Sequence, residues 1–242
     1  MSCQFFGSCN CSLVAKLIEG LKSDEKSASA IAARVQNVLT YGKEHYNGEF
    51  TSEETLKNVT LQDVINHYNT YFVPSNAYLV VIGDVKTADV KKKVEELFGA
   101  DVWKKATAPN LTYNDPKDLQ YSQINFVDVP NAVQSEIALI NLSKLKMNDK
   151  DYFAAILANQ ILGGGGEGRL FLNLREKHGW TYGSYSNLGA SKYISKFSST
   201  ASVRNAVTDS AVVEIFNELK RIRTDLVSEK KKKNAKAKYI GN

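Results

Sequence analysis

The sequence predicts an α+β fold, in which helices pack on one face of antiparallel sheets. Apolar residues recur every three or four positions in residues 13–39 and 207–222, as in amphipathic helices. Residues 182–189 and 193–203 have the composition of two strands joined as a hairpin that is polar on one face. Both halves of the chain combine strand segments with long helices, which favours this fold class.

The first part of the chain is predicted to be largely helical. Gly42 should end the helix over 13–39. Thr60-Leu61-Gln62-Asp63 has the spacing of a capping box, with Asp in the acidic position. The helix that begins there should end before Pro74. Its apolar face consists of Leu61, Val64, Ile65, Tyr68 and Phe72.

A strand and a helix should follow. Residues 78–82 form the longest apolar run, which suits a buried strand. Residues 87–98 form a helix that Thr87 caps and Gly99 ends.

The second part should contain further strands and helices. Residues 123–127 and 136–142 are predicted as strands separated by Pro130-Asn131. Two helices, 149–162 and 168–177, flank a run of glycines. The helix over 207–222 should bury a stripe formed by Val212, Ile215, Phe216, Leu219 and Ile222.

Composition limits the classes of function. The net charge is +5, and Lys230–Lys233 supply four of those charges, as on a solvated helix face. No basic surface interleaved with aromatics indicates nucleic-acid binding. No apolar run approaches the roughly 20 residues of a membrane span.

Residues 1–12 hold all three cysteines (Cys3, Cys9 and Cys11) and lack the features of a signal peptide, so they are interpreted as an atypical leader outside the fold. Residues 107–118, rich in proline and turn formers, are the predicted interdomain linker.

The sequence offers no catalytic residue and no metal ligand. Its three histidines, His45, His67 and His178, have no second His or Cys at a chelating spacing, and they are expected to be surface residues. A Gly-x-Ser-x-Gly nucleophile elbow is also missing from the sequence. We therefore expect no activity from this chain alone.

The glycine run Gly163, Gly164, Gly165 and Gly166, followed by Glu167-Gly168, is the most unusual segment. Such a run indicates a sharp bend or a close approach of the backbone to another group. A phosphate-binding loop is disfavoured, because Lys-Ser/Thr does not follow the glycines and no strand precedes them. A loop that binds an extended peptide and a plain turn between helices both remain open.

Arg175 and Tyr182 flank a predicted reversal at Gly179. Arg175 on the last helical turn and Tyr182 at the strand start can point into one space. Together they could hydrogen-bond a peptide carbonyl. Each residue also has a purely structural alternative. Arg175 could form an ion pair with Glu176, and Tyr182 could be a half-buried residue of the strand.

Residues 162–182, LGGGGEGRLFLNLREKHGWTY, resemble the second-domain signature of the pitrilysin/insulinase-type metallopeptidases, which include the mitochondrial processing peptidases and bacterial zinc proteases. Residues 71–76 with 78–85 resemble the end of the first domain of that family. The resemblance extends from Leu17 to Lys238. It implies that residues 13–106 are the C-terminal part of a first peptidase-like domain. Residues 119–242 would be the N-terminal and central part of a second, peptide-binding domain, so that both domains are incomplete.

The resemblance further implies a site and a division of labour. Arg175 and Tyr182 would hold the substrate backbone, and Gly163–Gly166 would contribute to substrate binding. The zinc motif His-x-x-Glu-His is absent, and Glu19, near the place of a third ligand, is not assigned as one. Zinc would then belong to a partner or to a segment outside this chain. The implied role is a non-catalytic portion that holds peptides or unfolded polypeptides in a bacterial periplasm or cytoplasm. The alternative is a structural or assembly subunit.

Overall fold

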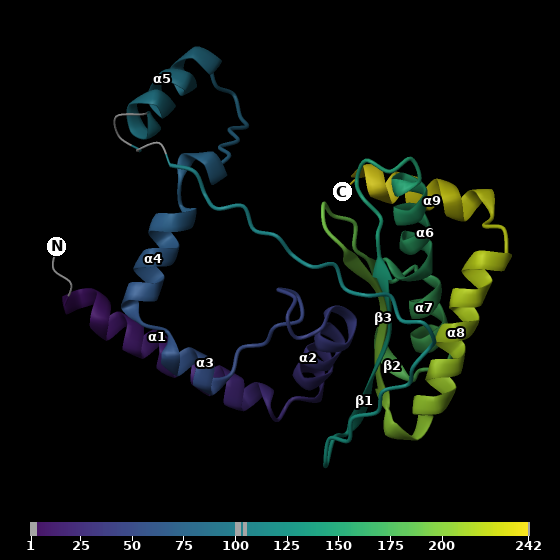
Figure 1. Ribbon diagram of the computed structural model, residues 1–242. Coiled ribbons are helices and arrows are strands. Elements are labelled where there is room, and N and C mark those ends of the chain that lie inside the picture. The colour runs from purple at the N-terminus through teal and green to yellow at the C-terminus, as the bar shows by residue number, and fades with distance from the viewer. Residues whose placement is uncertain (1–3, 100–102, 104–105, 242) are drawn as a thin grey trace. The chain divides into compact units, whose positions relative to one another are not determined.

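The computed structural model describes residues 4–99, 103 and 106–241 of the chain. By the packing of their residues they divide into two compact units, which are shown in Figure 1 and described separately below. The first unit comprises Met1–Leu21 and Thr51–Tyr113, and the second, called the sheet unit, comprises Lys22–Phe50 and Asn114–Asn242. The predicted sequential division at residues 107–118 stays a prediction.

The described part of the first unit is built of helices and extended segments. Its helices are most of α1 (Gln4–Asp24), α3 (Glu53–Asn58), α4 (Leu61–Tyr71), η1 (Pro74–Asn76) and α5 (Thr87–Phe98). The predicted capping box of α4 is confirmed. The Thr60 side chain accepts a bond from the Asp63 amide at 3.2 Å, and the Thr60 amide donates to the Asp63 carboxylate at 2.8 Å. Thr87 is the first helical residue of α5 and not its cap, because Lys86 occupies the N-cap position.

The predicted helix over 13–39 is two helices, α1 and α2 (Ala28–Tyr41). The break has a local cause, because the Ser27 side chain accepts a bond from the Ala30 amide and starts a new helix. Gly42 ends α2 as predicted, with φ of 83°. Of residues 1–12, predicted as a leader outside the fold, residues 4–12 are helical, since α1 begins at Gln4, and Met1–Cys3 lie outside the described residues. Their assignment as a leader stays a prediction.

The predicted strands at 78–82 and 123–127 are extended segments without a hydrogen-bonded partner strand among the described residues. Tyr78 is 95% exposed and Ile124 is 99% exposed. A β-strand needs a neighbour to bond its main-chain groups, so apolar composition alone does not make one. The apolar face predicted for the helix over 61–72 is likewise exposed, for example at Tyr68 and Phe72.

The sheet unit contains a three-stranded antiparallel sheet. Strands β1 (Gln134–Ser143), β2 (Thr181–Leu188) and β3 (Ser195–Arg204) lie in the order β1-β3-β2. The predicted β2–β3 hairpin and the α+β fold class are confirmed. Helices α6 (Tyr152–Gly163), α7 (Arg169–Phe171) and α8 (Thr208–Thr224) lie on one side of the sheet in Figure 1, and α2 lies on the other. The remaining elements are η2 (Leu172–Lys177), η3 (Asn205–Val207) and α9 (Glu229–Gly241).

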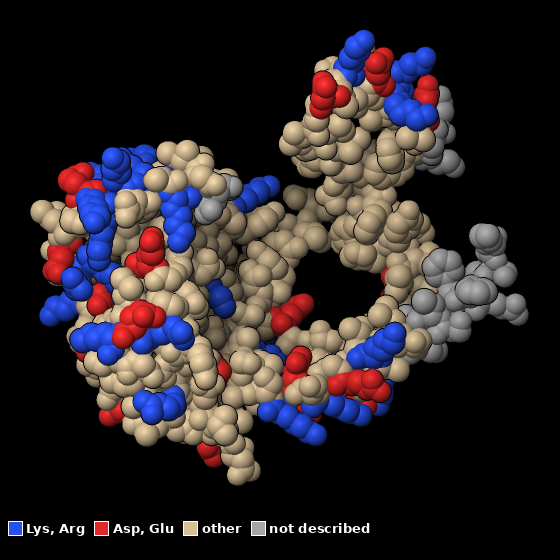
Figure 2. Space-filling model, turned by 180° about the vertical axis from the view of Figure 1, so that it is seen from behind, with Lys and Arg blue, Asp and Glu red and all other residues tan. Residues whose placement is uncertain are grey.

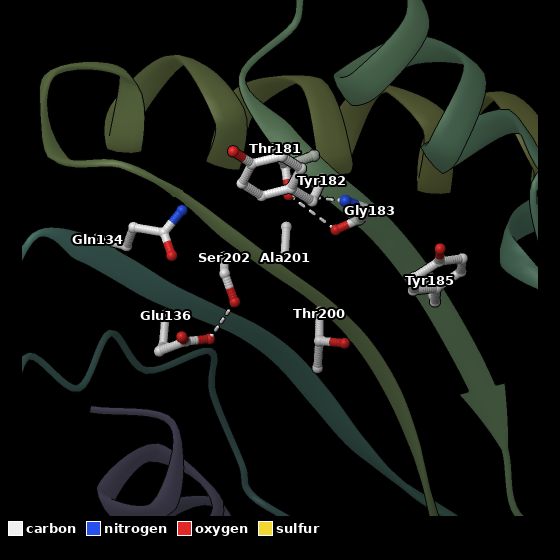
Figure 3. A pocket seen from close by; sticks show the side chains of 9 residues that line it. All are labelled: Gln134, Glu136, Thr181, Tyr182, Gly183, Tyr185, Thr200, Ala201 and Ser202. Carbon is white, nitrogen blue, oxygen red and sulfur yellow. Dashed lines mark hydrogen bonds between the residues drawn. The ribbon is translucent and has the colours of Figure 1, made fainter. Parts of the chain in front are cut away.

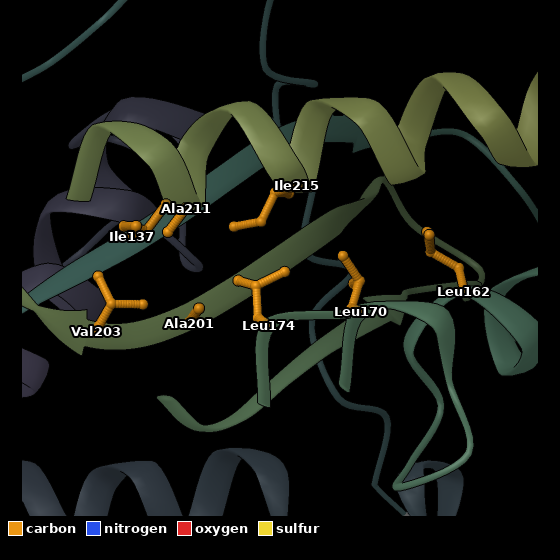
Figure 4. Close-up of a cluster of buried hydrophobic side chains, with 8 residues drawn as sticks. All are labelled: Ile137, Leu162, Leu170, Leu174, Ala201, Val203, Ala211 and Ile215. Carbon is orange, nitrogen blue, oxygen red and sulfur yellow. The ribbon is translucent and has the colours of Figure 1, made fainter. Parts of the chain in front are cut away.

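The core of this unit lies between the sheet and the helices α6, α7 and α8 (Figure 4). Its fully buried side chains include Val203 of β3, Leu174 of η2 and Ile215 of α8. Of the stripe predicted for α8, Ile215 is buried, whereas Phe216 is 57% exposed. The helix turns Ala211, Ile215 and Glu218 inward at spacings of four and three, which leaves Phe216 at the edge of the buried face.

The opposite face of the sheet, called the open face, carries the alternate side chains of the strands. Glu136 of β1 lies opposite Ser202 of β3, and Ala138 lies opposite Thr200. At one end, Lys196 of β3 donates to the side chain of Asn37 in α2 at 2.7 Å. Burial at this contact lowers the pKa of Lys196. Helix α2 therefore lies over the Lys196 end of the open face.

No described helix has both the length and the apolar character needed to cross a membrane. Lys230–Lys233 lie exposed on α9, as predicted for a solvated helix face. On the face of the sheet unit shown in Figure 2, acidic side chains lie among the basic ones.

Stability of the sheet unit at low pH should depend on Glu214 of α8. The amide of Asn173 donates to its carboxylate at 2.7 Å, and this bond holds the pKa of Glu214 below its usual value of 4.5. Because the pKa of Glu214 is lower in the folded protein than in the unfolded chain, the ionised carboxylate stabilises the fold above about pH 4.5. This stabilisation is lost as the pH falls through the pKa of the folded state.

We therefore expect the difference in free energy of unfolding between the wild type and Glu214→Gln to shrink between pH 7 and pH 3. Urea unfolding at each pH measures this difference, in which the effects of other carboxylates cancel. Glutamine keeps the bond to Asn173 but cannot ionise. A difference that stays constant over this range would contradict the assignment.

Candidate functional site

A wide helical turn and a glycine bring the chain from the helices into β2. In η2 the amide of His178 bonds the carbonyl of Asn173 at 3.1 Å, which is the five-residue spacing of a π-helix. The amide of Gly179 then bonds the carbonyl of Arg175 at 2.9 Å, and Gly179 has φ of 63°. This left-handed conformation favours glycine, so Gly179 reverses the chain here. The predicted reversal is confirmed.

Arg175 contacts the main chain of Tyr182. Its Nη1 donates to the Tyr182 carbonyl at 3.2 Å, and its Nε lies 3.3 Å from Glu176 Oε1. The guanidinium also lies 5.6 Å from the ring centre of Phe171. The structure thus joins Arg175 to the backbone of Tyr182. Tyr182 itself is 84% exposed.

A pocket of about 470 Å³ lies on the open face of the sheet (Figure 3). Tyr182 lines it, whereas Arg175 and Gly163–Gly166 are not among its lining residues. All three strands contribute to its wall: Gln134, Glu136, Thr181, Tyr182, Gly183, Tyr185, Thr200, Ala201 and Ser202. Sequence reasoning found only Tyr182 among these residues.

An irregularity in β2 shapes this pocket. The register between β2 and β3 shifts between Thr181 and Ser184, so β2 holds an extra residue there. Gly183 lies at the shift, and a Cβ at this position would be 2.5 Å from the ring of Tyr185. Glycine therefore allows the Tyr185 ring to lie against the strand. Gly183 between Tyr182 and Tyr185 is the feature of the sequence that could have indicated this pocket.

Among the described residues that line the pocket, Glu136 is the one with a carboxyl group. Its Oε2 accepts a bond from Ser202 Oγ at 2.6 Å, and Figure 3 shows this pair at the β1 side of the pocket. No cation pairs with Glu136 in the described part of the chain. The alternation of residues in β1 could have placed Glu136 on the polar face, but only the register places it opposite Ser202.

The glycine run has a packing function at its start. Gly163 is buried at the end of α6, where a Cβ would be 2.4 Å from the Ser186 amide nitrogen. Gly165 has φ of 137°, and a Cβ there would be 3.2 Å from Lys238 Nζ. Gly163 therefore lets α6 approach β2 closely. Whether Gly163–Gly166 also bind substrate stays a prediction.

His67 is exposed as predicted, whereas His45 and His178 differ from the surface positions predicted for them. His45 is 6% exposed and stacks on Tyr41, with ring centres 5.1 Å apart. His178 is partly buried and stacks on Trp180 at 4.0 Å. Within the described residues, no three His, Cys, Asp or Glu side chains could hold a metal ion. The His, Cys, Asp and Glu side chains of the described residues therefore do not fit a zinc centre.

Residues 58–239 match a family model described as the peptidase M16 inactive domain. The chain belongs to the peptidase M16 family. The "probable inactive metalloprotease YmfF" of Bacillus subtilis (strain 168) is 22% identical to this M16 chain over 161 residues, which is 66% of the chain and 36% of YmfF.

Solved structures show the same fold. A peptidase M16 inactive domain from Pseudomonas fluorescens has a TM-score of 0.82 and 20% identity, over 97% of this M16 chain and 56% of that one. The periplasmic protease PqqL from Escherichia coli has a TM-score of 0.71 and 16% identity, over 96% of this chain and 25% of its own. This M16 chain thus spans from about a quarter to just over half the length of these relatives.

Proposed function

We propose that this M16 domain binds extended peptides at the open face of its sheet and does not cut them itself. The observation that carries the proposal is the pocket formed by Tyr182, Tyr185 and the polar side chains of β1 and β3. Aromatic rings combined with hydroxyl, amide and carboxylate groups suit the side chains of a polypeptide.

The outer edge of β2 offers main-chain hydrogen bonds to such a peptide. In the described sheet, β2 pairs on one side only, with β3. An extended peptide can add to an exposed edge, where main-chain bonds supply affinity and side-chain pockets supply specificity. Arg175 lies at this strand through its bond to the Tyr182 carbonyl. A guanidinium has five N–H donors, so Arg175 retains donors for a peptide carbonyl.

Hydrolysis would belong to a zinc-bearing M16 domain or chain that works with this one. The family model for an inactive domain and the likeness to an "inactive metalloprotease" support this division of labour. The contribution of this chain would be to bind and orient the polypeptide. Orientation alone can supply a large share of a rate enhancement, because it replaces a random encounter by a held geometry.

The test is peptide binding by the whole chain, measured as fluorescence anisotropy of a labelled, extended eight-residue peptide. We expect Tyr182→Ala to weaken binding about tenfold, since truncating a central aromatic residue of a binding surface costs more than about 1 kcal/mol. Arg175→Ala should weaken binding too. Phe216→Ala is the matched control, because Phe216 is an exposed aromatic residue on α8, on the other side of the sheet.

Unchanged affinity in Tyr182→Ala, or equal losses in Tyr182→Ala and Phe216→Ala, would contradict the proposal. Circular dichroism of each variant separates a lost contact from a lost fold. Absence of binding by the wild type would instead favour a structural or assembly role.

A further inference from the structure

We infer that the pocket on the open face selects a peptide with a lysine or arginine side chain. This inference rests on the proposed function and names the class of substrate for the same site. Glu136 is the one Asp, Glu, Lys, Arg or His among the described residues that line the pocket.

The carboxylate of Glu136 can still accept a cation. One of its oxygens, Oε2, takes the bond from Ser202 Oγ at 2.6 Å. A carboxylate has about four lone-pair sites, so Oε1 and part of Oε2 stay available to N–H donors. Arg204, the register partner of Gln134, is the nearest cation along β3 on this face, but it neither lines the pocket nor pairs with Glu136. Lys196, further along the same strand, is bonded to Asn37.

Two tyrosine rings complete a surface for a cation with an apolar stem. Tyr182 and Tyr185 are 84% and 44% exposed, so their rings are open to a ligand. An aromatic face attracts a nearby ammonium or guanidinium group. The methylene groups of lysine and arginine also pack on apolar surface while the charged end reaches a polar group.

The width of the sheet favours a long side chain. Neighbouring strands lie about 4.8 Å apart, so a peptide paired with the outer edge of β2 lies roughly 10 Å from β3. The bond to Ser202 Oγ brings the Glu136 carboxylate toward β3. A short side chain would stop at the tyrosines of β2, whereas a lysine or arginine side chain extends past them toward this carboxylate. The pocket therefore fits a basic residue better than a short or an acidic one.

Three labelled peptides that differ only at one position, occupied by lysine, norleucine or glutamate, test this selectivity. The variable position is moved along the peptide to find the residue that enters the pocket. We expect the lysine peptide to bind about three- to tenfold more tightly than the norleucine peptide, and the glutamate peptide to bind most weakly. The preference should shrink in 0.5 M salt, because the pocket is open to solvent.

Glu136→Gln should abolish the preference for lysine, so that this variant binds the lysine and norleucine peptides with affinities within about twofold of each other. The net charge of +5 repels a cationic peptide overall, so a preference lost in this variant reports the local carboxylate. Equal binding of the lysine and norleucine peptides by the wild type would overturn this inference alone. A lysine preference that survives in Glu136→Gln would also overturn it. Failure of all three peptides to bind would overturn the proposed function instead.

Discussion

Replacement of Leu174 by alanine should lower the free energy of unfolding of the sheet unit by about 2–5 kcal/mol. Leu174 is fully buried in η2 and packs in the core with Leu170, Val203 and Ile215. Truncation removes buried methyl groups and leaves a cavity that the surrounding helices and strands can fill only in part. The same segment forms the π-helical turn that contains Arg175, so the site should loosen together with the core.

Urea unfolding followed by the fluorescence of Trp180, in a Trp103→Phe background, measures this effect. The chain has two tryptophans, and Trp180 packs against the core of the sheet unit. Leu172→Ala is the matched control, since Leu172 belongs to the same helical segment but is 42% exposed. The control should cost less than about 1 kcal/mol. Equal losses from the two substitutions would show that Leu174 does not support the core as the structure indicates.

Replacement of Gly163 by alanine should destabilise the same unit by about 1–3 kcal/mol. The added Cβ would lie 2.4 Å from the Ser186 amide nitrogen and 2.8 Å from Leu170 Cδ1, closer than real Cβ atoms come to such neighbours. The first neighbour is backbone of β2, so relief requires α6 or the strand to move. Because Ser186 follows Tyr185 in β2, peptide affinity should fall along with stability.

Gly166→Ala separates packing from flexibility in the same loop. The nearest atom to a Cβ at Gly166 is Phe171 Cε1 at 3.9 Å, which is an ordinary contact. We expect its free energy of unfolding to stay within about 0.5 kcal/mol of the wild type in the assay described above. If Gly163→Ala proves as mild as Gly166→Ala, the close approach of α6 to β2 is not what requires glycine at Gly163.

Local signals predicted the local structure well. The bonds between Thr60 and Asp63 join groups three residues apart, so the sequence names both partners of the cap. Gly42 and Gly179 end or reverse elements because of their own backbone conformation, with φ of 83° and 63°. Helix α8 shows the limit of such signals. Its period correctly predicted that Ile215 is buried, but Phe216, from the same predicted stripe, is exposed. The packing against the sheet decides which edge of the stripe is covered.

Segments that depend on a distant partner were predicted less well. Residues 78–82 have the composition of a strand, yet no described strand pairs with them, and Tyr78 stays exposed. Main-chain bonds of a sheet join residues far apart in sequence, so apolar character describes a tendency and not a pairing. His45 shows the same limit, because its burial depends on the surrounding rings of Tyr41 and Tyr46.

By itself the sequence determined the family signature, the absence of a His-x-x-Glu-His motif, the cap at Thr60 and the helix end at Gly42, because each depends on residues close together in the chain. It also placed Tyr182 at the start of a strand. Only the tertiary structure brought Glu136 of β1 opposite Ser202 of β3 and into one pocket with the tyrosines of β2. These residues are separated by tens of positions, and a shift of one residue in register would turn Glu136 to the core face. The chemistry of the pocket is therefore a property of strand pairing.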